Sequence, residues 1–152
     1  MSYIMDLRKK VGHDPVIYLG TTLLVFNEKN EMLLNLRTDT LDWGIPGGGK
    51  ELFETIEECA IRELKEETNI EANDLKLLAV LSGKEYYFEY PNGDETDCVI
   101  VLYKVENYNG ELKINDDESK ELKFFSLDDL PKLESRTKVI IDKIKNGEIN
   151  IN

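Results

Sequence analysis

Three glutamates recur at the spacing of one helix face in the segment Thr55–Asn69. Glu66 and Glu67 stand three and four residues after Glu63, so a helix would bring the three carboxylates within about one turn of each other. Like charges at this spacing repel by roughly 0.2–0.5 kcal/mol per pair, and the C-terminal end of a helix disfavours anions. A divalent cation such as Mg²⁺ or Mn²⁺ would remove this cost, because such ions prefer hard oxygen ligands. The alternative is the solvated acidic face of an ordinary helix.

The same segment carries the signals of a helix that packs one face against the core. Thr55 and Glu58 have the spacing of a capping box, in which each side chain satisfies the other residue's backbone N–H group. Continuing the apolar face by threes and fours leads to the three glutamates, so the stripe that should enter the core becomes acidic. The apolar face consists of Ile56, Cys59 and Ala60, with Leu64 at its flank.

A glycine-rich loop, WGIPGGGK, stands directly before this helix at residues 43–50. Consecutive glycines allow positive φ angles and a close approach of the backbone to a ligand, although such a loop by itself is no more than a turn. The spacing of the loop and the helix together is more specific. Counting from Gly48, five residues precede Glu54, and seven more precede Arg62, which begins the run RELKEETNI.

This spacing resembles the Nudix box, G-x5-E-x7-R-E-U-x-E-E-x-G-U with U aliphatic, of the MutT-type Nudix hydrolases. Every defined position matches except Asn69, which stands where the family has glycine. Asn tolerates the left-handed conformation that ends a helix, so we expect the turn to survive. The resemblance implies an α+β fold, the Nudix-type α/β/α sandwich with a mixed β-sheet between helices. It also implies a single domain over residues 1–152, with residues 1–15 as an N-terminal helical extension.

The resemblance also implies a ligand set and a reaction. Glu63, Glu66 and Glu67 would bind Mg²⁺ or Mn²⁺, with a further contact from the backbone carbonyl of Gly47. The implied reaction is attack of water on a phosphorus of a nucleoside diphosphate that is linked to another group. Metal ions would neutralise the phosphate oxygens and lower the pKa of the attacking water.

Arg62 would be a structural partner of carboxylates such as Glu54 or Glu66 and would hold the loop against the helix; a simple surface ion pair is the alternative. The general base is open among Glu66, Glu67 and an acid from a later loop, for which Glu118 is the first choice. Glu95 is a weaker candidate. A solvated loop charge is the alternative role of Glu118.

The rest of the chain predicts an α+β layered domain, because strand-like segments surround one helix and a second helix follows them. The first two strand segments are expected to form a hairpin through Asn27–Asn30, and Pro91–Asp94 reads as a further turn. The glycine-rich segment 42–50 is expected to be a loop. Strands are expected at 16–26, 32–36, 75–82, 85–90, 97–105 and 122–126, and helices at 3–11, 55–67 and 135–145.

Composition narrows the function further. The 152 residues suit one domain, and 31 acidic against 19 basic residues give a net charge of −12. This charge disfavours nucleic-acid binding by attraction, and it means that a phosphate substrate needs a cation at the site. The sequence has no run of about 18 apolar residues, so no membrane-spanning helix is expected. The first residues do not have the pattern of a secretory signal. Cys59 and Cys98 are expected to be reduced thiols of a cytoplasmic protein.

Several alternatives remain at this stage. The substrate is a nucleoside triphosphate, an oxidised nucleotide or an ADP-ribose-like molecule; an RNA 5′-pyrophosphohydrolase and a non-catalytic nucleotide-binding Nudix module are the competing functions. His13, the single histidine, is expected to be structural or at the surface. Segment 3–11 could pack on its own domain or on a second subunit, so a homodimer is possible. The aromatic residues Tyr86, Tyr87, Phe88 and Tyr90 either stack on a base or pack in the core.

Overall fold

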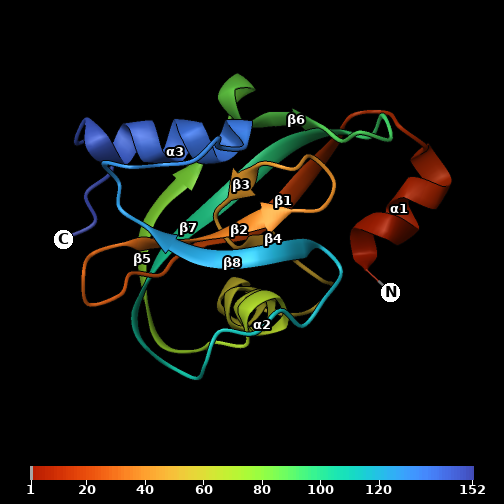
Figure 1. The fold of residues 1–152 in the computed structure, drawn as a ribbon. Coiled ribbons are helices and arrows are strands. Elements are labelled where there is room, and N and C mark those ends of the chain that lie inside the picture. The colour runs from red at the N-terminus through yellow and green to blue at the C-terminus, as the bar shows by residue number, and fades with distance from the viewer. Residues whose placement is uncertain (1) are drawn as a thin grey trace.

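The computed structural model describes residues 2–152, in which two sheets lie between two helices (Figure 1). Helix α2 (Ile56–Thr68) covers one side of the strands and α3 (Ser135–Lys145) covers the other. The strands are β1 (Val16–Leu24), β2 (Met32–Arg37), β3 (Trp43–Gly44), β4 (Gly47–Gly49), β5 (Glu71–Leu81), β6 (Tyr87–Glu89), β7 (Glu95–Asn109) and β8 (Ser119–Phe125). The larger sheet has the order β4-β1-β7-β5, with β6 on β7, and the smaller has the order β3-β2-β8. Because β1 is parallel to β7 and antiparallel to β4, the predicted mixed-sheet sandwich is confirmed.

The core lies on both faces of the strands. Leu23 of β1 belongs to the cluster that packs on Leu64 of α2, whereas the next residue, Leu24, packs with Ile140 of α3. Successive side chains of a strand point to opposite faces, so a strand that is covered on both sides reads as a continuous apolar run. This explains why β1 and β2 have no clear polar alternation in the sequence.

The predicted hairpin between the first two strands is correct only at its turn. Leu33 donates its backbone N–H to the carbonyl of Val25 at 2.9 Å, and Phe26 forms an isolated bridge with Met32. Beyond these residues the strands separate, because β1 pairs with β4 and β7 while β2 pairs with β3 and β8. Residues of both sheets therefore line one cleft, which also contains the α2 glutamates.

Two further predictions need correction. Residues 85–90 are not one strand, because a 3-10 turn, η1 (Lys84–Tyr86), precedes β6 and is closed by a hydrogen bond from Tyr86 N–H to the Gly83 carbonyl. Segment 42–50 is not only a loop, because it contains β3 and β4. The turn at 91–94 is confirmed, with Gly93 at a φ of 93°.

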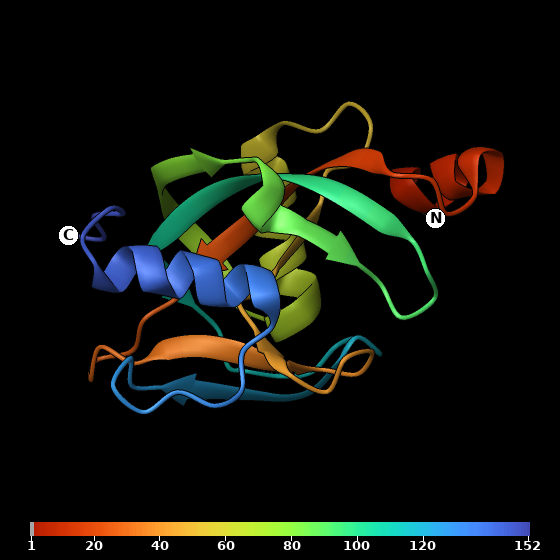
Figure 2. The same ribbon diagram turned by 90° about the horizontal axis from the view of Figure 1, so that it is seen from above.

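Helix α1 (Tyr3–Val11) forms as predicted and projects from the body of the domain (Figure 2). The buried guanidinium of Arg8 anchors it, donating to the carbonyl oxygens of Asp14 at 2.6 Å and Glu95 at 2.5 Å. At its other end, the N–H of Tyr3 donates to the carboxylate of Glu51 at 2.6 Å, which ties the helix to the loop before α2. No helix within residues 2–152 is long and apolar enough to cross a membrane.

Candidate active site

Both ends of α2 have the predicted caps. The Thr55 hydroxyl accepts from the N–H of Glu58 at 3.0 Å, and the Glu58 carboxylate accepts from the N–H of Thr55 at 2.9 Å. At the other end, Asn69 is left-handed with a φ of 67°, and its N–H donates to the carbonyl of Lys65. The helix therefore ends as expected despite the missing glycine, and the capping box sets where the acidic residues fall on its face.

The three glutamates of α2 are not equivalent. Glu67 is 4% exposed and lies on the buried face with Leu64, which is in the core rather than at its flank. The Glu63 side chain is 14% exposed, and that of Glu66 is 55% exposed. The predicted acidic stripe thus runs from the core to the surface, because residue 66 is rotated away from the face that residues 63 and 67 share.

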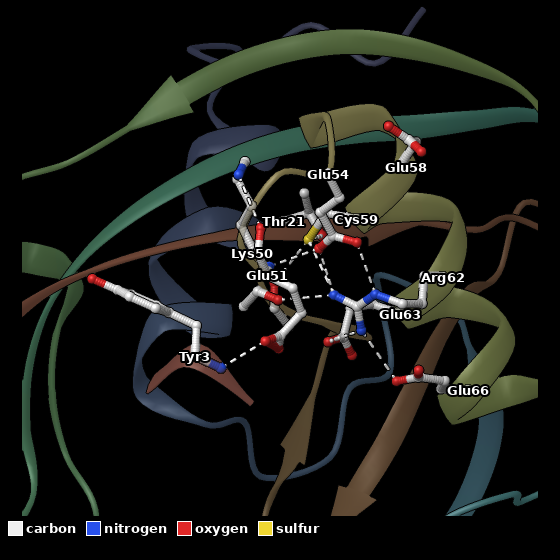
Figure 3. Close-up of polar contacts among 12 residues, drawn as sticks. Tyr3, Thr21, Lys50, Glu51, Glu54, Glu58, Cys59, Arg62, Glu63 and Glu66 are labelled. Carbon is white, nitrogen blue, oxygen red and sulfur yellow. Dashed lines mark hydrogen bonds and ion pairs between the residues drawn. The ribbon is translucent and has the colours of Figure 1, made fainter. Parts of the chain in front are cut away.

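Arg62 holds these carboxylates and the preceding loop together (Figure 3). Its guanidinium donates to both oxygens of Glu54, at 2.7 and 3.0 Å, and to the Gly49 carbonyl at 3.1 Å. It also donates to Glu63 at 2.9 Å and to Glu66 at 3.3 Å. The predicted contacts with Glu54 and Glu66 are both present. The bond from Arg62 lowers the pKa of Glu54 to about 2, so Glu54 is a fixed anion of this network.

The three glycines before α2 are required by crowding. None of Gly47, Gly48 and Gly49 has a positive φ. A Cβ at Gly48 would overlap the Glu63 carboxylate, and one at Gly49 would lie 2.5 Å from the Tyr18 hydroxyl. Likewise, a Cβ at Gly47 would overlap the backbone of β1. These glycines therefore do not use the positive φ angles that they would allow; they are needed because side chain and backbone atoms of the protein lie too close for a Cβ.

Burial makes the anionic forms of Glu67 and Glu63 unfavourable. It raises the pKa of Glu67 well above its ordinary value; the charges of Glu63 and Glu118 raise it further, and the Gly47 N–H opposes them. Burial also raises the pKa of Glu63 to about 7, although Arg62 lowers it. A cation at these carboxylates would restore both charges, because it replaces the water that they lost.

The donor set fits a divalent cation in its chemistry. Glu67 is bonded within residues 2–152 to the Gly47 N–H alone, at 3.3 Å, and a carboxylate has about four acceptor positions. In the described part of the chain, no three acidic, histidine or cysteine side chains already surround one point, since Arg62 draws Glu63 and Glu66 to itself. Rotation of these two side chains away from Arg62 would supply hard oxygen ligands beside Glu67.

The acids outside the helix fall in different places. Glu118 is exposed and lines the same cleft as the three glutamates, and its N–H is held by the Asp116 carboxylate at 3.1 Å. Glu95 does not line the cleft; its carboxylate accepts from the Tyr87 hydroxyl at 2.6 Å. His13 is exposed at the far end of α1 and bonds Asp94 at 2.7 Å, in keeping with a structural or surface role. The structure therefore places Glu118, the first-choice acid, in the same cleft as the α2 glutamates, and it places Glu95, the weaker candidate, outside that cleft.

Several residues of the cleft had no signal in the sequence. Tyr18, Arg37 and Arg136 line it from β1, the end of β2 and the first turn of α3. Tyr90 is the one member of the aromatic segment that lines it, whereas Tyr86 is buried in the core. Isolated residues on separate elements have no spacing to recognise, so only tertiary structure shows that they share a site.

The cleft is large, with a volume of about 1340 Å³, and it runs from the α2 glutamates to α1. This exceeds the roughly 300–1,000 Å³ that is usual for small-molecule sites. Cys59 and Cys98 are both buried, and neither forms a disulfide bond. The geometry thus presents an acidic, metal-compatible wall inside a space that can hold a nucleotide and a second group linked to it.

Comparisons with known proteins identify the family of this chain. The NUDIX domain model matches residues 18–144. An ADP-ribose pyrophosphatase of Methanocaldococcus jannaschii is 34% identical over 148 residues, covering 95% of this chain and 80% of that protein. A Bacillus subtilis protein, provisionally named an 8-oxo-dGTP diphosphatase, is 30% identical over 134 residues, covering 88% and 83%. The crystal structure of a MutT NUDIX hydrolase from Burkholderia pseudomallei superposes with a TM-score of 0.71 at 26% identity, covering 86% and 98%.

The chain belongs to the NUDIX domain family. The predicted enzyme class, a Nudix hydrolase that acts on a pyrophosphate linkage, is confirmed at this level.

Proposed function

We propose that the protein hydrolyses the diphosphate linkage of ADP-ribose or a closely similar nucleoside diphosphate sugar, with Mg²⁺ or Mn²⁺ as cofactor. The observation that carries this proposal is the buried Glu67 carboxylate beside Glu63 on a cleft wall, where a divalent cation resolves an otherwise unfavourable charge. The sugar-linked substrate is supported by the similarity to an ADP-ribose pyrophosphatase along 95% of the chain. Water attack on one phosphorus would break the P–O–P bond and yield AMP and ribose 5-phosphate.

The residues of α2 and its loop would hold the metal ions. Glu67 is the fixed ligand in this proposal, because its burial and its bond to Gly47 N–H restrict its position. Glu63 and Glu66 would join it by leaving Arg62, and the carbonyl of Gly47 would add a neutral ligand. When bound, the ions neutralise phosphate oxygens and lower the pKa of the attacking water.

Glu118 is the general base in this proposal. Glu63, Glu66 and Glu67 would be engaged as metal ligands, whereas Glu118 is an exposed acid of the same cleft that Arg62 does not contact, so its carboxylate stays available to a water molecule. Its backbone is fixed from two sides, by the Asp116 carboxylate on its N–H and by the Thr38 hydroxyl on its carbonyl at 3.2 Å. A base needs such positioning to reach the proton of the attacking water.

An oxidised nucleoside triphosphate is the second candidate, favoured by the Bacillus subtilis relative. The net charge of −12 weighs against an RNA 5′ end, whose neighbouring phosphates would be repelled. A binding module without activity is disfavoured because it would have no need of the self-repelling glutamates on α2.

The test is a panel assay of the full chain with Mg²⁺ or Mn²⁺ and with a chelator. The panel holds ADP-ribose, 8-oxo-dGTP, canonical triphosphates and a 5′-triphosphorylated RNA. We expect metal-dependent cleavage of ADP-ribose, reduced about a thousandfold in Glu67→Gln and unchanged in Glu57→Gln, an exposed acid on the same helix. Turnover of 8-oxo-dGTP alone would favour the second candidate. If no compound of the panel were cleaved, the non-catalytic binding module would be the better interpretation.

A further inference from the structure

Two arginines meet in the cleft away from α2. Arg37 ends β2 and Arg136 lies in the first turn of α3, and both line the same cleft as the glutamates. Both guanidiniums lie over the ring of Phe88, with centroid distances of 5.5 Å and 4.0 Å. Their side chains are 22% and 14% exposed. The charge of Arg136 acts to lower the pKa of Arg37, as expected for two neighbouring cations that repel each other, and the exposed part of each side chain lines the cleft.

Each arginine has one carboxylate partner and donors to spare. Arg37 donates through Nε and Nη2 to Asp39, at 2.9 and 2.7 Å. Arg136 donates through Nε to Glu134 at 2.7 Å and through Nη1 to the sulfur of Cys98 at 3.4 Å. A guanidinium carries five N–H donors. Among the hydrogen bonds within residues 2–152, Nη1 of Arg37 and Nη2 of Arg136 donate to no protein atom.

The charge of Arg37 acts on Glu118, an acid of the same cleft. Partial desolvation by the cleft raises the pKa of Glu118 although its side chain is exposed, and the Arg37 guanidinium opposes the rise. Glu118 in turn raises the pKa of Glu67. The cleft therefore has an acidic part, which repels phosphate until a cation binds, and a basic part, which attracts phosphate without one.

We infer that Arg37 and Arg136 form a second, metal-independent anion subsite, which binds the phosphate group of the substrate that is not attacked at the glutamates. The inference rests on the proposed function, because it takes the substrate to be a diphosphate. Planar guanidinium forks recognise phosphate oxygens in pairs, and the Phe88 ring keeps both planes in place. The subsite would hold one end of the linkage while the other end reaches the acidic wall.

The test measures binding of inorganic phosphate to the full chain in the presence of a chelator, by ³¹P NMR titration. Without metal the glutamates repel phosphate, so binding reports the arginines. We expect Arg37→Gln to weaken binding about tenfold, as loss of a charge-assisted hydrogen bond does. Arg136→Lys, which keeps the ion pair with Glu134, should weaken it by several fold because the fork is lost.

Two matched variants separate the subsite from overall charge. Lys138→Gln removes the same charge from an exposed position on α3 and should bind phosphate like the wild type. Asp39→Asn frees the Nε and Nη2 donors of Arg37 and should bind phosphate more tightly. Unfolding transitions of all variants check that each chain is folded.

Equal phosphate affinity in the wild type, Arg37→Gln and Arg136→Lys would overturn the subsite, as would a wild type that binds no phosphate under chelation. A loss in Lys138→Gln as large as in Arg37→Gln would reduce the effect to net charge. The outcome is independent of the hydrolysis panel, because the titration contains neither metal nor nucleotide. A chain that binds phosphate but cleaves nothing would keep the subsite and sink the proposed reaction.

Discussion

The arginine of α2 and the arginine pair beside Phe88 lie in one cleft but are bound differently. Arg62 donates to three carboxylates (Glu54, Glu63 and Glu66), to the Gly49 carbonyl and, at 4.0 Å, to the sulfur of Cys59. Arg37 and Arg136 each contact a single carboxylate. The first arrangement leaves the guanidinium committed to the protein, whereas the second leaves donors for a ligand.

This difference separates two ways of building a site. The α2 region organises itself: one arginine fixes the loop, the helix and the acids, and all these residues lie within one short segment. The arginine pair is assembled by the fold, because Arg37 of β2 and Arg136 of α3 belong to distant parts of the chain and lie over the same Phe88 ring. Variants of the two regions should therefore fail differently, with structural losses in the first and binding losses in the second.

Outside the α2 region, the largest expected effect comes from Glu118. Glu118→Gln should lower turnover by about a hundredfold or more, as removal of a general base does, with little change in the free energy of unfolding. Single-turnover kinetics with saturating Mg²⁺ would measure it. Glu121→Gln, an exposed acid on β8 that does not line the cleft, is the matched control. An undiminished rate in Glu118→Gln would assign all acid–base chemistry to α2 instead.

A smaller loss of rate, joined to a loss of stability, is expected inside the α2 region. Arg62→Lys cannot keep two bonds to Glu54 and bonds to Glu63 and the loop, so turnover should fall about tenfold and stability by about 2 kcal/mol. Denaturant unfolding beside the activity assay would show both. Lys65→Gln removes a surface ion pair with Glu71 and should change stability by about 0.5 kcal/mol or less. If Arg62→Lys lost rate without losing stability, Arg62 would resemble the cleft pair.

Much of the α2 region could be predicted from the sequence because its interactions are local. The capping box, the left-handed Asn69 and the partners of Arg62 depend on residues a few positions apart, so spacing alone indicates them. The different exposures of Glu63 and Glu66 could not be predicted from the sequence. They depend on how far α2 is rotated against the strands, which spacing does not determine.

The rest of the cleft could not be predicted, because it depends on long-range packing. The sequence suggests a hairpin from two apolar segments, whereas the strands part into different sheets that each contribute to the cleft. Arg37 looks like an ordinary strand end and Arg136 like an ordinary helix residue. Their shared contact with Phe88 exists only after both sheets and α3 have packed.

The smallest expected effect concerns acid stability and tests how firmly the α2 region is held. The pKa of Glu54 is about 2 in the folded protein and 4.5 ordinarily, so the unfolded chain binds its proton more readily. The stabilisation by Arg62 is therefore complete above about pH 4.5 and is lost as the pH falls toward 2. Wild type should exceed Glu54→Gln in the free energy of unfolding by about 1–2 kcal/mol at pH 6, and this difference should narrow by pH 3.

Urea unfolding of both chains between pH 6 and pH 3 would measure the gap, and the difference between them cancels the titration of the other acids. A gap that stayed constant with pH would mean that Glu54 acts through packing and hydrogen-bond geometry rather than through its charge. In that case the contrast between the two arginine regions would lose its electrostatic basis.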